Sequence, residues 1–226
     1  MIRAVVFDLW NTLVYSPGGS PFKQAQAQLR PDQLAEFPAM VAEGMRRSYP
    51  DARGLLETWS TRLQLDEAQV EAMTQAFAHA CREARLYPET LDALNRTREL
   101  GRIALLSNTQ SFDMGLLDEL GLRNQFRVLA LSADQGYLKP EPAAFEAMQK
   151  KLGLFPGNLA MVGDSWTDDV QGALDAGWTA IWVNRTGRPR PEHDPEADLV
   201  EVADLALVPE VIARLQAGAR CSTCLG

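Results

Sequence analysis

Residues 4–12 read Ala4-Val5-Val6-Phe7-Asp8-Leu9-Trp10-Asn11-Thr12, four apolar residues followed directly by a carboxylate. An unbroken apolar run of this kind is typical of a parallel strand that is covered on both faces. Asp8 would then lie at the carboxyl end of that strand, where open α/β sheets bind their ligands. Taken alone, Asp8 could instead cap a turn, so its interpretation depends on the residues that follow the other strands.

The sequence after residue 88 alternates between strand and helix patterns, and several helical stretches end at a glycine such as Gly101. Apolar runs predict four further strands and one edge strand, at residues 103–106, 128–131, 159–162, 179–183 and 199–202. This alternation predicts an α/β fold in which a parallel sheet carries helices on both of its faces.

Residues 16–87 have a different pattern. They begin with a segment rich in turn-forming residues around Gly18-Gly19, and no convincing strand follows. Three helices are predicted instead from stripes of apolar residues, and Pro38 must kink or delay the first of them. The stripes are Leu34, Phe37, Val41 and Met45; Leu55, Trp59 and Leu63; and Val70, Met73, Phe77, Ala80 and Ala84. We therefore predict a core domain of residues 1–15 and 88–226, interrupted by a small all-helical domain of residues 16–87.

Composition narrows the possible functions. The chain has 226 residues, 46% of them hydrophobic, and a formal net charge of -8, which disfavours a nucleic-acid partner. No apolar stretch is long enough to span a membrane, and the run before Asp8 is too short for a secretory signal. A cytoplasmic protein that acts on a small molecule, as a monomer or a homodimer, is expected. Cys221 and Cys224 form a Cys-x-x-Cys without a second pair or a nearby histidine, so no zinc site is expected there.

Four polar residues follow predicted strands, or the loops that leave them, at the same edge of the sheet. Asp8 could attack an electrophile, Ser107 could donate a hydrogen bond to a phosphoryl oxygen, and Lys139 could offset the negative charge. Asp164 and Asp8 together could hold a hard divalent cation such as Mg²⁺, which prefers oxygen ligands. These four residues together, two acidic, one cationic and one with a hydroxyl, indicate phosphate chemistry.

The same residues lie in motifs that resemble those of the haloacid dehalogenase (HAD) superfamily of hydrolases. The resemblance covers nearly the whole chain, and the helical module lies where that family inserts a helical cap. The matching motifs are Asp8-Leu-Trp-Asn-Thr12, Leu106-Ser-Asn108, Gly136-Tyr-Leu-Lys-Pro-Glu-Pro142 with Phe145, and Gly163-Asp-Ser-Trp-Thr-Asp-Asp-Val-Gln-Gly-Ala173.

The resemblance implies a Rossmann-like parallel sheet with a small all-helical cap and a covalent intermediate at Asp8. It implies Mg²⁺ as cofactor, bound by Asp8, Asp164 and the backbone carbonyl of Trp10. Asp169 is implied as a further acidic group near the metal and Lys139. Ser107 and Lys139 join Asp8 as catalytic residues, whereas Asn108 could contact the phosphoryl group or equally hold the turn.

Trp10 departs from the pattern of the family's phosphatases, which carry a second Asp at this position as general acid and base. An indole N–H cannot protonate a leaving alkoxide at neutral pH, and general acid–base help is typically worth ~10²–10⁴-fold in rate. We therefore expect a Mg²⁺-dependent phosphatase that hydrolyses a small phosphorylated metabolite through an aspartyl-phosphate at Asp8. In this interpretation Trp10 contacts the substrate and replaces the usual acid.

Two alternatives remain open. The family's dehalogenases carry an aromatic residue at the position of Trp10, because a departing halide needs no proton. Against a 2-haloacid dehalogenase, the chain retains Asp164 and has Phe145 where that branch has Tyr. The second alternative is a catalytically weak protein that binds a phosphorylated ligand.

Overall fold

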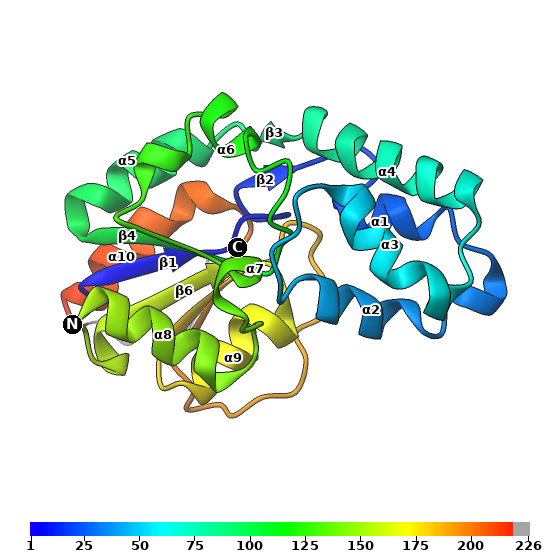
Figure 1. Ribbon diagram of the computed structural model, residues 1–226. Helices are drawn as coiled ribbons and strands as arrows, with labels where there is room; N and C mark the ends of the chain where they lie inside the picture. The colour runs from blue at the N-terminus through cyan, green and yellow to red at the C-terminus, as the bar shows by residue number, and fades with distance from the viewer. Residues whose placement is uncertain (219–226) are drawn as a thin grey trace.

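The computed structural model describes residues 1–218 and divides into a sheet-containing part and a helical part (Figure 1). A six-stranded, all-parallel sheet has the order β5-β4-β1-β6-β7-β8. Its strands, in chain order, are β1 Ala4–Phe7, β4 Arg102–Ser107, β5 Val128–Leu131, β6 Leu159–Gly163, β7 Thr179–Val183 and β8 Leu199–Val202. The predicted Rossmann-like α/β fold is confirmed.

Strand β1 lies at the centre of the sheet, and its side chains alternate between two hydrophobic cores. Val5 and Phe7 pack on the side of helices α5 Thr90–Leu100 and α10 Val208–Gln216. Val6 packs on the opposite side, against helix α8 Pro142–Leu152. Every residue of β1 is therefore buried, which explains its unbroken apolar run.

Residues 16–84 carry the helices α1 Pro21–Gln26, α2 Phe37–Gly44, α3 Ala52–Leu63 and α4 Glu67–Arg82, and a short turn at Pro31–Gln33. They enclose a core of their own, in which Leu55, Trp59, Met73 and Phe77 are fully buried. Pro38 lies in the first turn of α2, so it delays the helix to Phe37 and does not kink it. Leu34 consequently precedes the helix and is 40% exposed, so its predicted place in the apolar stripe is wrong.

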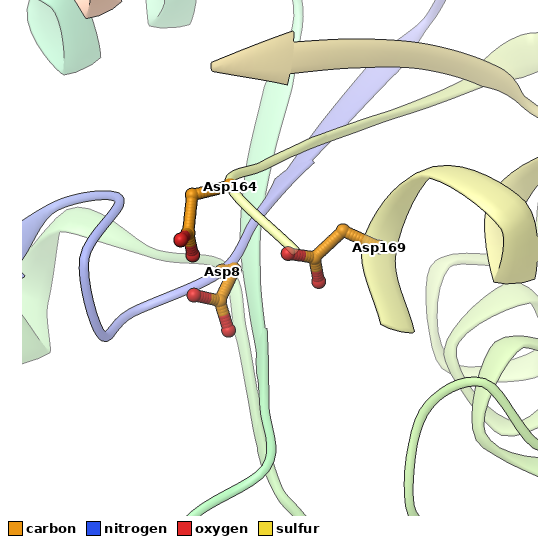
Figure 2. Close-up of side chains that lie close together, drawn as sticks. All are labelled: Asp8, Asp164 and Asp169. Carbon is orange, nitrogen blue, oxygen red and sulfur yellow. The ribbon is translucent and has the colours of Figure 1, made fainter. Parts of the chain in front are cut away.

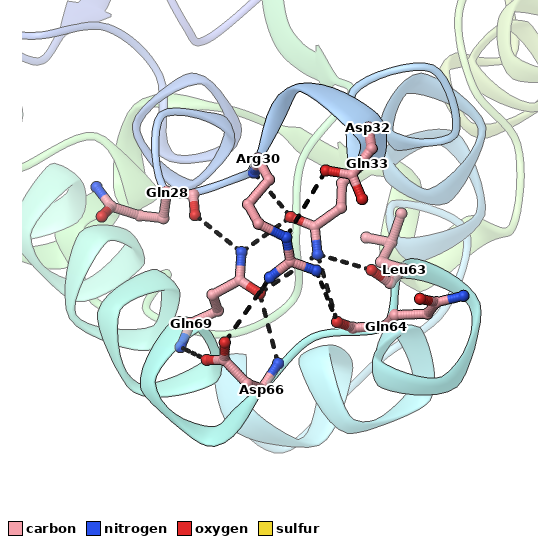
Figure 3. A network of polar contacts seen from close by, with 8 residues as sticks. All are labelled: Gln28, Arg30, Asp32, Gln33, Leu63, Gln64, Asp66 and Gln69. Atoms are coloured by element: carbon pink, nitrogen blue, oxygen red, sulfur yellow. Dashed lines mark hydrogen bonds and ion pairs between the residues drawn. The ribbon is translucent and has the colours of Figure 1, made fainter.

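A network of polar contacts, buried at Gln33 and exposed at Arg30, joins segments of this helical part (Figure 3). The amide of Gln33 donates to the carbonyl of Leu63 at 2.7 Å and accepts from the backbone N–H of Arg30 at 2.8 Å. Gln69, in the first turn of α4, donates to Gln33 at 2.8 Å and accepts from the Arg30 guanidinium at 2.6 Å. The segment between α1 and α2 is thus fixed to α3 and α4, so the helices form one packed unit.

The chain crosses between the two parts twice, and the crossings are paired. Strand β2 Val14–Tyr15 forms an antiparallel ladder with β3 Arg85–Leu86. The guanidinium of Arg185 lies 3.5 Å from the ring centre of Tyr87, and it forms an ion pair of 2.7 Å with Glu89. Two-residue strands are too short to give a sequence pattern, so this ladder was not predicted.

Other segments differ in detail from the sequence pattern. A short helix, α7 Ser132–Gln135, precedes the loop of residues 136–141 that carries Lys139, called the lysine loop below. Helix α6 spans only Leu116–Glu119. A wide π-helical turn, η4 Trp166–Gln171, leads into α9 Gly172–Asp175. Among residues 1–218, no helix combines the length and the apolar character needed to cross a membrane. Cys221 and Cys224 lie outside the described residues.

Candidate active site

The carboxyl edge of the sheet brings a lysine between two carboxylates. Lys139 Nζ donates to Asp8 Oδ1 at 2.7 Å and to Asp169 Oδ1 at 2.5 Å. The Lys139 side chain is only 2% exposed, and the residues come from three separate motifs. Asp8 follows β1, Lys139 follows α7, and Asp169 lies in η4. A buried ammonium in contact with two carboxylates fixes their positions relative to one another.

The turn after Asp8 connects two of the motif loops. The backbone N–H groups of Leu13 and Val14 both donate to the carbonyl of Leu9, and Asn11 adopts a left-handed conformation with φ 61°. This turn buries Thr12, whose hydroxyl accepts the backbone N–H of Asp164 at 3.1 Å. The Asn11-Thr12 pair after Asp8 therefore positions the loop that carries Asp164.

Asp164 and Asp169 are placed by the fourth motif, as Figure 2 shows. Gly163 has no side chain where a Cβ would collide with the Asp169 carboxyl group, so only glycine allows this close approach. Asp169 Oδ2 accepts the backbone N–H of Ser165 at 3.0 Å. The carbonyl of Asp164 accepts from Trp182 Nε1 at 3.1 Å and from the Arg188 guanidinium at 2.7 Å.

The electrostatics of the site favour an additional cation. Burial, followed by the nearby Asp8 carboxylate, raises the pKa of Asp164 to about 6. Burial also raises the pKa of Asp169, although Lys139 opposes that effect. Burial alone would lower the pKa of Lys139, but the two adjacent carboxylates outweigh it and raise the pKa, so the ammonium stays charged. Two cations, the buried Lys139 and the half-exposed Arg188 at 4.0 Å from the Asp164 carboxylate, thus face three acidic groups, so excess negative charge remains in the site.

The acidic groups fit a hard divalent ion. Asp8, Asp164 and Asp169 each offer an oxygen, and these oxygens lie within 4.8 Å of one another. An all-oxygen donor set of this kind suits Mg²⁺ better than a soft metal. Both oxygens of Asp169 already accept hydrogen bonds, which leaves Asp8 and Asp164 as the more available donors.

Ser107 and Asn108, at the end of β4, differ in their surroundings. Ser107 is 1% exposed, and its hydroxyl oxygen has no hydrogen-bond partner within the described part of the chain. Asn108 instead forms two bonds of 2.8 Å with the backbone of Lys139, one as donor and one as acceptor. Asn108 therefore holds the lysine loop against β4, whereas the Ser107 hydroxyl is unpaired.

Trp10 is held by a chain of buried hydrogen bonds. Its indole Nε1 donates to Thr109 Oγ1 at 3.2 Å, and Thr109 donates to Gln110 at 3.0 Å. Gln110 in turn donates to the sulfur of Cys81, on α4, at 3.4 Å. The only polar atom of the indole is thus used inside the protein, and Trp10 is 8% exposed.

A cavity of about 520 Å³ opens over Asp8, Lys139 and the Asp164–Asp169 loop. It is also lined by residues that sequence reasoning did not identify as functional. Among them are Ser20, Pro21, Phe22, Val41 and Met45 from the helical part, Gln110 and Trp166 from the core, and Arg188 from the loop after β7. In the sequence, Val41 and Met45 fit only the apolar stripe of a core helix, and no pattern marks Arg188 as functional.

These features define a class of protein: an α/β protein with an acidic site at the carboxyl edge of a Rossmann-like parallel sheet and a helical insertion after the first strand. The model of the haloacid dehalogenase-like hydrolases matches residues 2–177, and the chain belongs to this family.

Similar proteins include both phosphatases and dehalogenases. The chain is 37% identical over 136 residues to a phosphoserine phosphatase of Thermus thermophilus, a match that covers 58% of this chain and 55% of that protein. It thus spans about half the length of that relative. It is 27% identical over 210 residues to the N-acylneuraminate-9-phosphatase of Rattus norvegicus, covering 82% of this chain and 84% of the relative. The structure of a 2-haloacid dehalogenase from Pseudomonas syringae pv. Tomato DC3000 superposes with a TM-score of 0.69 at 25% identity, covering 95% and 100% of the two chains.

Proposed function

We propose that the chain is a Mg²⁺-dependent phosphatase in which Asp8 is the nucleophile and residues 16–87 form a cap over the site. The observation that carries this proposal is the position of Lys139 between Asp8 and Asp169, beside Asp164. Once a divalent cation offsets the excess negative charge, this group of charges suits a dianionic phosphate ester. The relatives that are named as phosphatases support the same assignment.

In the proposed reaction, a carboxylate oxygen of Asp8 attacks the phosphorus atom and forms an acyl phosphate, while the bond from phosphorus to the ester oxygen breaks. Water then attacks phosphorus, which releases inorganic phosphate and restores the carboxylate. Lys139 stabilises the negative charge on Asp8 and on the phosphoryl oxygens, and the unpaired hydroxyl of Ser107 donates to one of those oxygens.

Asp8, Asp164 and the backbone carbonyl of Trp10 would hold Mg²⁺, with Asp169 alongside. Bound there, the ion supplies neutralisation of the phosphoryl charge. The indole of Trp10 cannot donate a proton to the leaving group, so the leaving oxygen departs as an anion that is protonated from solvent. The reaction should therefore be fastest for alcohols that form stable anions.

The test is phosphate release from phenyl phosphate with Mg²⁺ and after its removal by EDTA. We expect release only with the metal, restored when Mg²⁺ is added back, and none from Asp8→Asn. Full activity in EDTA would overturn the proposal. Binding of phosphate without any turnover would instead identify a protein that only binds a phosphorylated ligand.

A 2-haloacid dehalogenase is the second candidate, because Trp10 occupies the position of the phosphatase acid and the Pseudomonas syringae enzyme has a similar fold. Phe145 is fully buried against Trp178 and Gly172, which leaves no polar group there for such a reaction. Chloride release from 2-chloropropionate in EDTA, without phosphatase activity, would decide for this candidate.

A further inference from the structure

The side of the cavity that the helical part contributes is apolar. From this part, Ser20, Pro21, Phe22, Val41 and Met45 line the cavity, and none of these is charged. We call Pro21, Phe22, Val41 and Met45 the apolar roof. The opposite side holds Asp8, Lys139 and Asp164, so the cavity is charged at one end and apolar at the other.

The cations closest in sequence to the roof have other positions. Arg46, next to Met45, forms a two-pronged ion pair with Glu141 and also donates to the carbonyl of Gly136 at 3.2 Å. Lys23, next to Phe22, lines a separate hollow together with His79. Neither side chain lines the cavity, so the roof offers no charge to a substrate.

Aromatic residues that line the cavity are held in fixed orientations. Phe22 packs edge to face on Phe77, with 5.1 Å between ring centres. Trp166 packs in the same way on Trp182 at 5.0 Å, and Trp10 is fixed through Thr109. Because the rings are already ordered by the protein, an apolar group that packed against them would cost little side-chain entropy.

Arg188 also lines the cavity, and unlike Lys139 it has no part in the proposed reaction. Its guanidinium donates to the carbonyl of Asp164, and its side chain is 50% exposed. Arg188 is therefore held beside Asp164 and is partly solvated. A carboxylate or ammonium that lies against the roof itself would lose water there without gaining a partner from the roof, which is unfavourable.

We infer that the substrate is the phosphate monoester of a small, uncharged alcohol with an apolar, aromatic body, and this inference rests on the proposed phosphatase function. Two independent observations support it. The apolar roof selects against charge on the organic part, and Trp10 in place of an acid selects for an alcohol that leaves as a stable anion. A phenol satisfies both conditions, because its anion is stabilised by the ring to which the oxygen is attached.

The experiment compares kcat/KM for 2-naphthyl, phenyl and 3-carboxyphenyl phosphate with Mg²⁺. The three phenols have similar acidities, so leaving-group ability is nearly constant and the polarity of the body varies. We expect 2-naphthyl phosphate to be preferred over 3-carboxyphenyl phosphate by roughly tenfold or more, the size of effect that apolar pocket contacts give. Equal rates, or a preference for the carboxylated ester, would overturn the inference while leaving the phosphatase proposal intact. Phosphate release from none of the esters would overturn both.

Met45→Lys provides a second measurement, because it adds a cation to the roof. We expect it to reverse the preference in favour of 3-carboxyphenyl phosphate. Leu34→Lys is the matched control, since Leu34 belongs to the same helical part, is 40% exposed and does not line the cavity. If Met45→Lys folds with a normal melting temperature and still prefers 2-naphthyl over 3-carboxyphenyl phosphate as the wild type does, the inference is wrong.

Discussion

Lys139 Nζ lies 2.7 Å from Asp8 Oδ1, although 131 positions separate the two residues in the sequence. Lys139 lies in a loop that the Asn108 side chain holds against the end of β4, through two hydrogen bonds with the Lys139 backbone. The contact therefore depends on the ends of three strands of one sheet: β1 before Asp8, β4 before Asn108, and β5 before α7 and the lysine loop. It links the stability of the core to the proposed chemistry.

Removal of this lysine should affect both properties. In Lys139→Met, Asp8 and Asp169 lose a buried partner, so we expect the free energy of unfolding to fall by about 3–5 kcal/mol at neutral pH. Phosphate release should fall to background. Urea denaturation and the phenyl phosphate assay measure the two effects. Lys150→Met, on the exposed surface of α8, is the control and should change neither.

Replacement of Trp10 tests the missing acid. In Trp10→Asp, a new carboxyl group at this position should raise the rate on alkyl phosphates by up to ~10²-fold and narrow their deficit against aryl phosphates. Trp10→Phe also loses the bond to Thr109 but adds no acid, so it should leave the ratio of the two rates unchanged.

Loss of the indole is expected to destabilise Trp10→Asp by ~3–5 kcal/mol and Trp10→Phe by less, so melting temperature and metal affinity must be measured on the same samples. If folded, metal-loaded Trp10→Asp gains nothing on alkyl phosphates, the native reaction does not require an acid at this position.

Metal affinity should depend on pH through Asp164, whose pKa is raised to about 6. Below that pH a proton occupies the carboxylate and competes with the ion, so the apparent Kd for Mg²⁺ should rise as pH falls from 7 to 5. Above pH 7 the carboxylate is ionised and the affinity should level off. The same raised pKa means that the metal-free protein binds the proton more tightly when folded, so it should become more stable as pH falls from 7 towards 5. Calorimetric titration with Mg²⁺ across this range tests the first prediction, and urea denaturation of the metal-free protein tests the second, with Asp164→Asn for comparison in both.

Arg46 connects the helical part to the lysine loop through its ion pair with Glu141. Arg46→Gln should weaken closure of the helical part, which raises KM several-fold with little change in kcat. A larger effect is not expected, because both side chains are more than a third exposed and such pairs contribute about 0–1 kcal/mol. Arg47→Gln is the matched control, since Arg47 pairs with Glu43 of the same helical part.

Hydrogen exchange gives an independent measure of closure. Amides of residues 16–87 should exchange more slowly when the wild-type protein binds a phosphate analogue, and this slowing should be smaller in Arg46→Gln. Identical exchange with and without the analogue would argue against a closing cap.

The sequence was most informative where periodicity and burial coincide. The apolar run before Asp8 predicted a doubly covered central strand, and the structure confirms it because both faces of β1 meet a hydrophobic core. The parallel sheet followed from the alternation of patterns. The short ladder β2–β3 was missed, because two residues carry no periodicity.

The site was predictable only in part. Strand ends indicated that Asp8, Ser107, Lys139 and Asp164 would lie at one edge, and family resemblance added Asp169. Val41 and Met45 were interpreted only as packing residues, since a residue at the border of a core has the same pattern whether its free side meets solvent or substrate. Arg188 lies in a polar loop whose path depends on tertiary contacts, so no local signal marks it.

Phosphorylation of Asp8 can be detected by acid quenching during a single turnover of phenyl phosphate with Mg²⁺. Borohydride then reduces an acyl phosphate to the corresponding alcohol, and mass spectrometry locates the modified residue. We expect homoserine at position 8 and no modification of any other acidic residue. Phosphate released during turnover with an unmodified Asp8 at every quench time, or modification at Asp164 or Asp169 instead, would contradict the proposed role of Asp8.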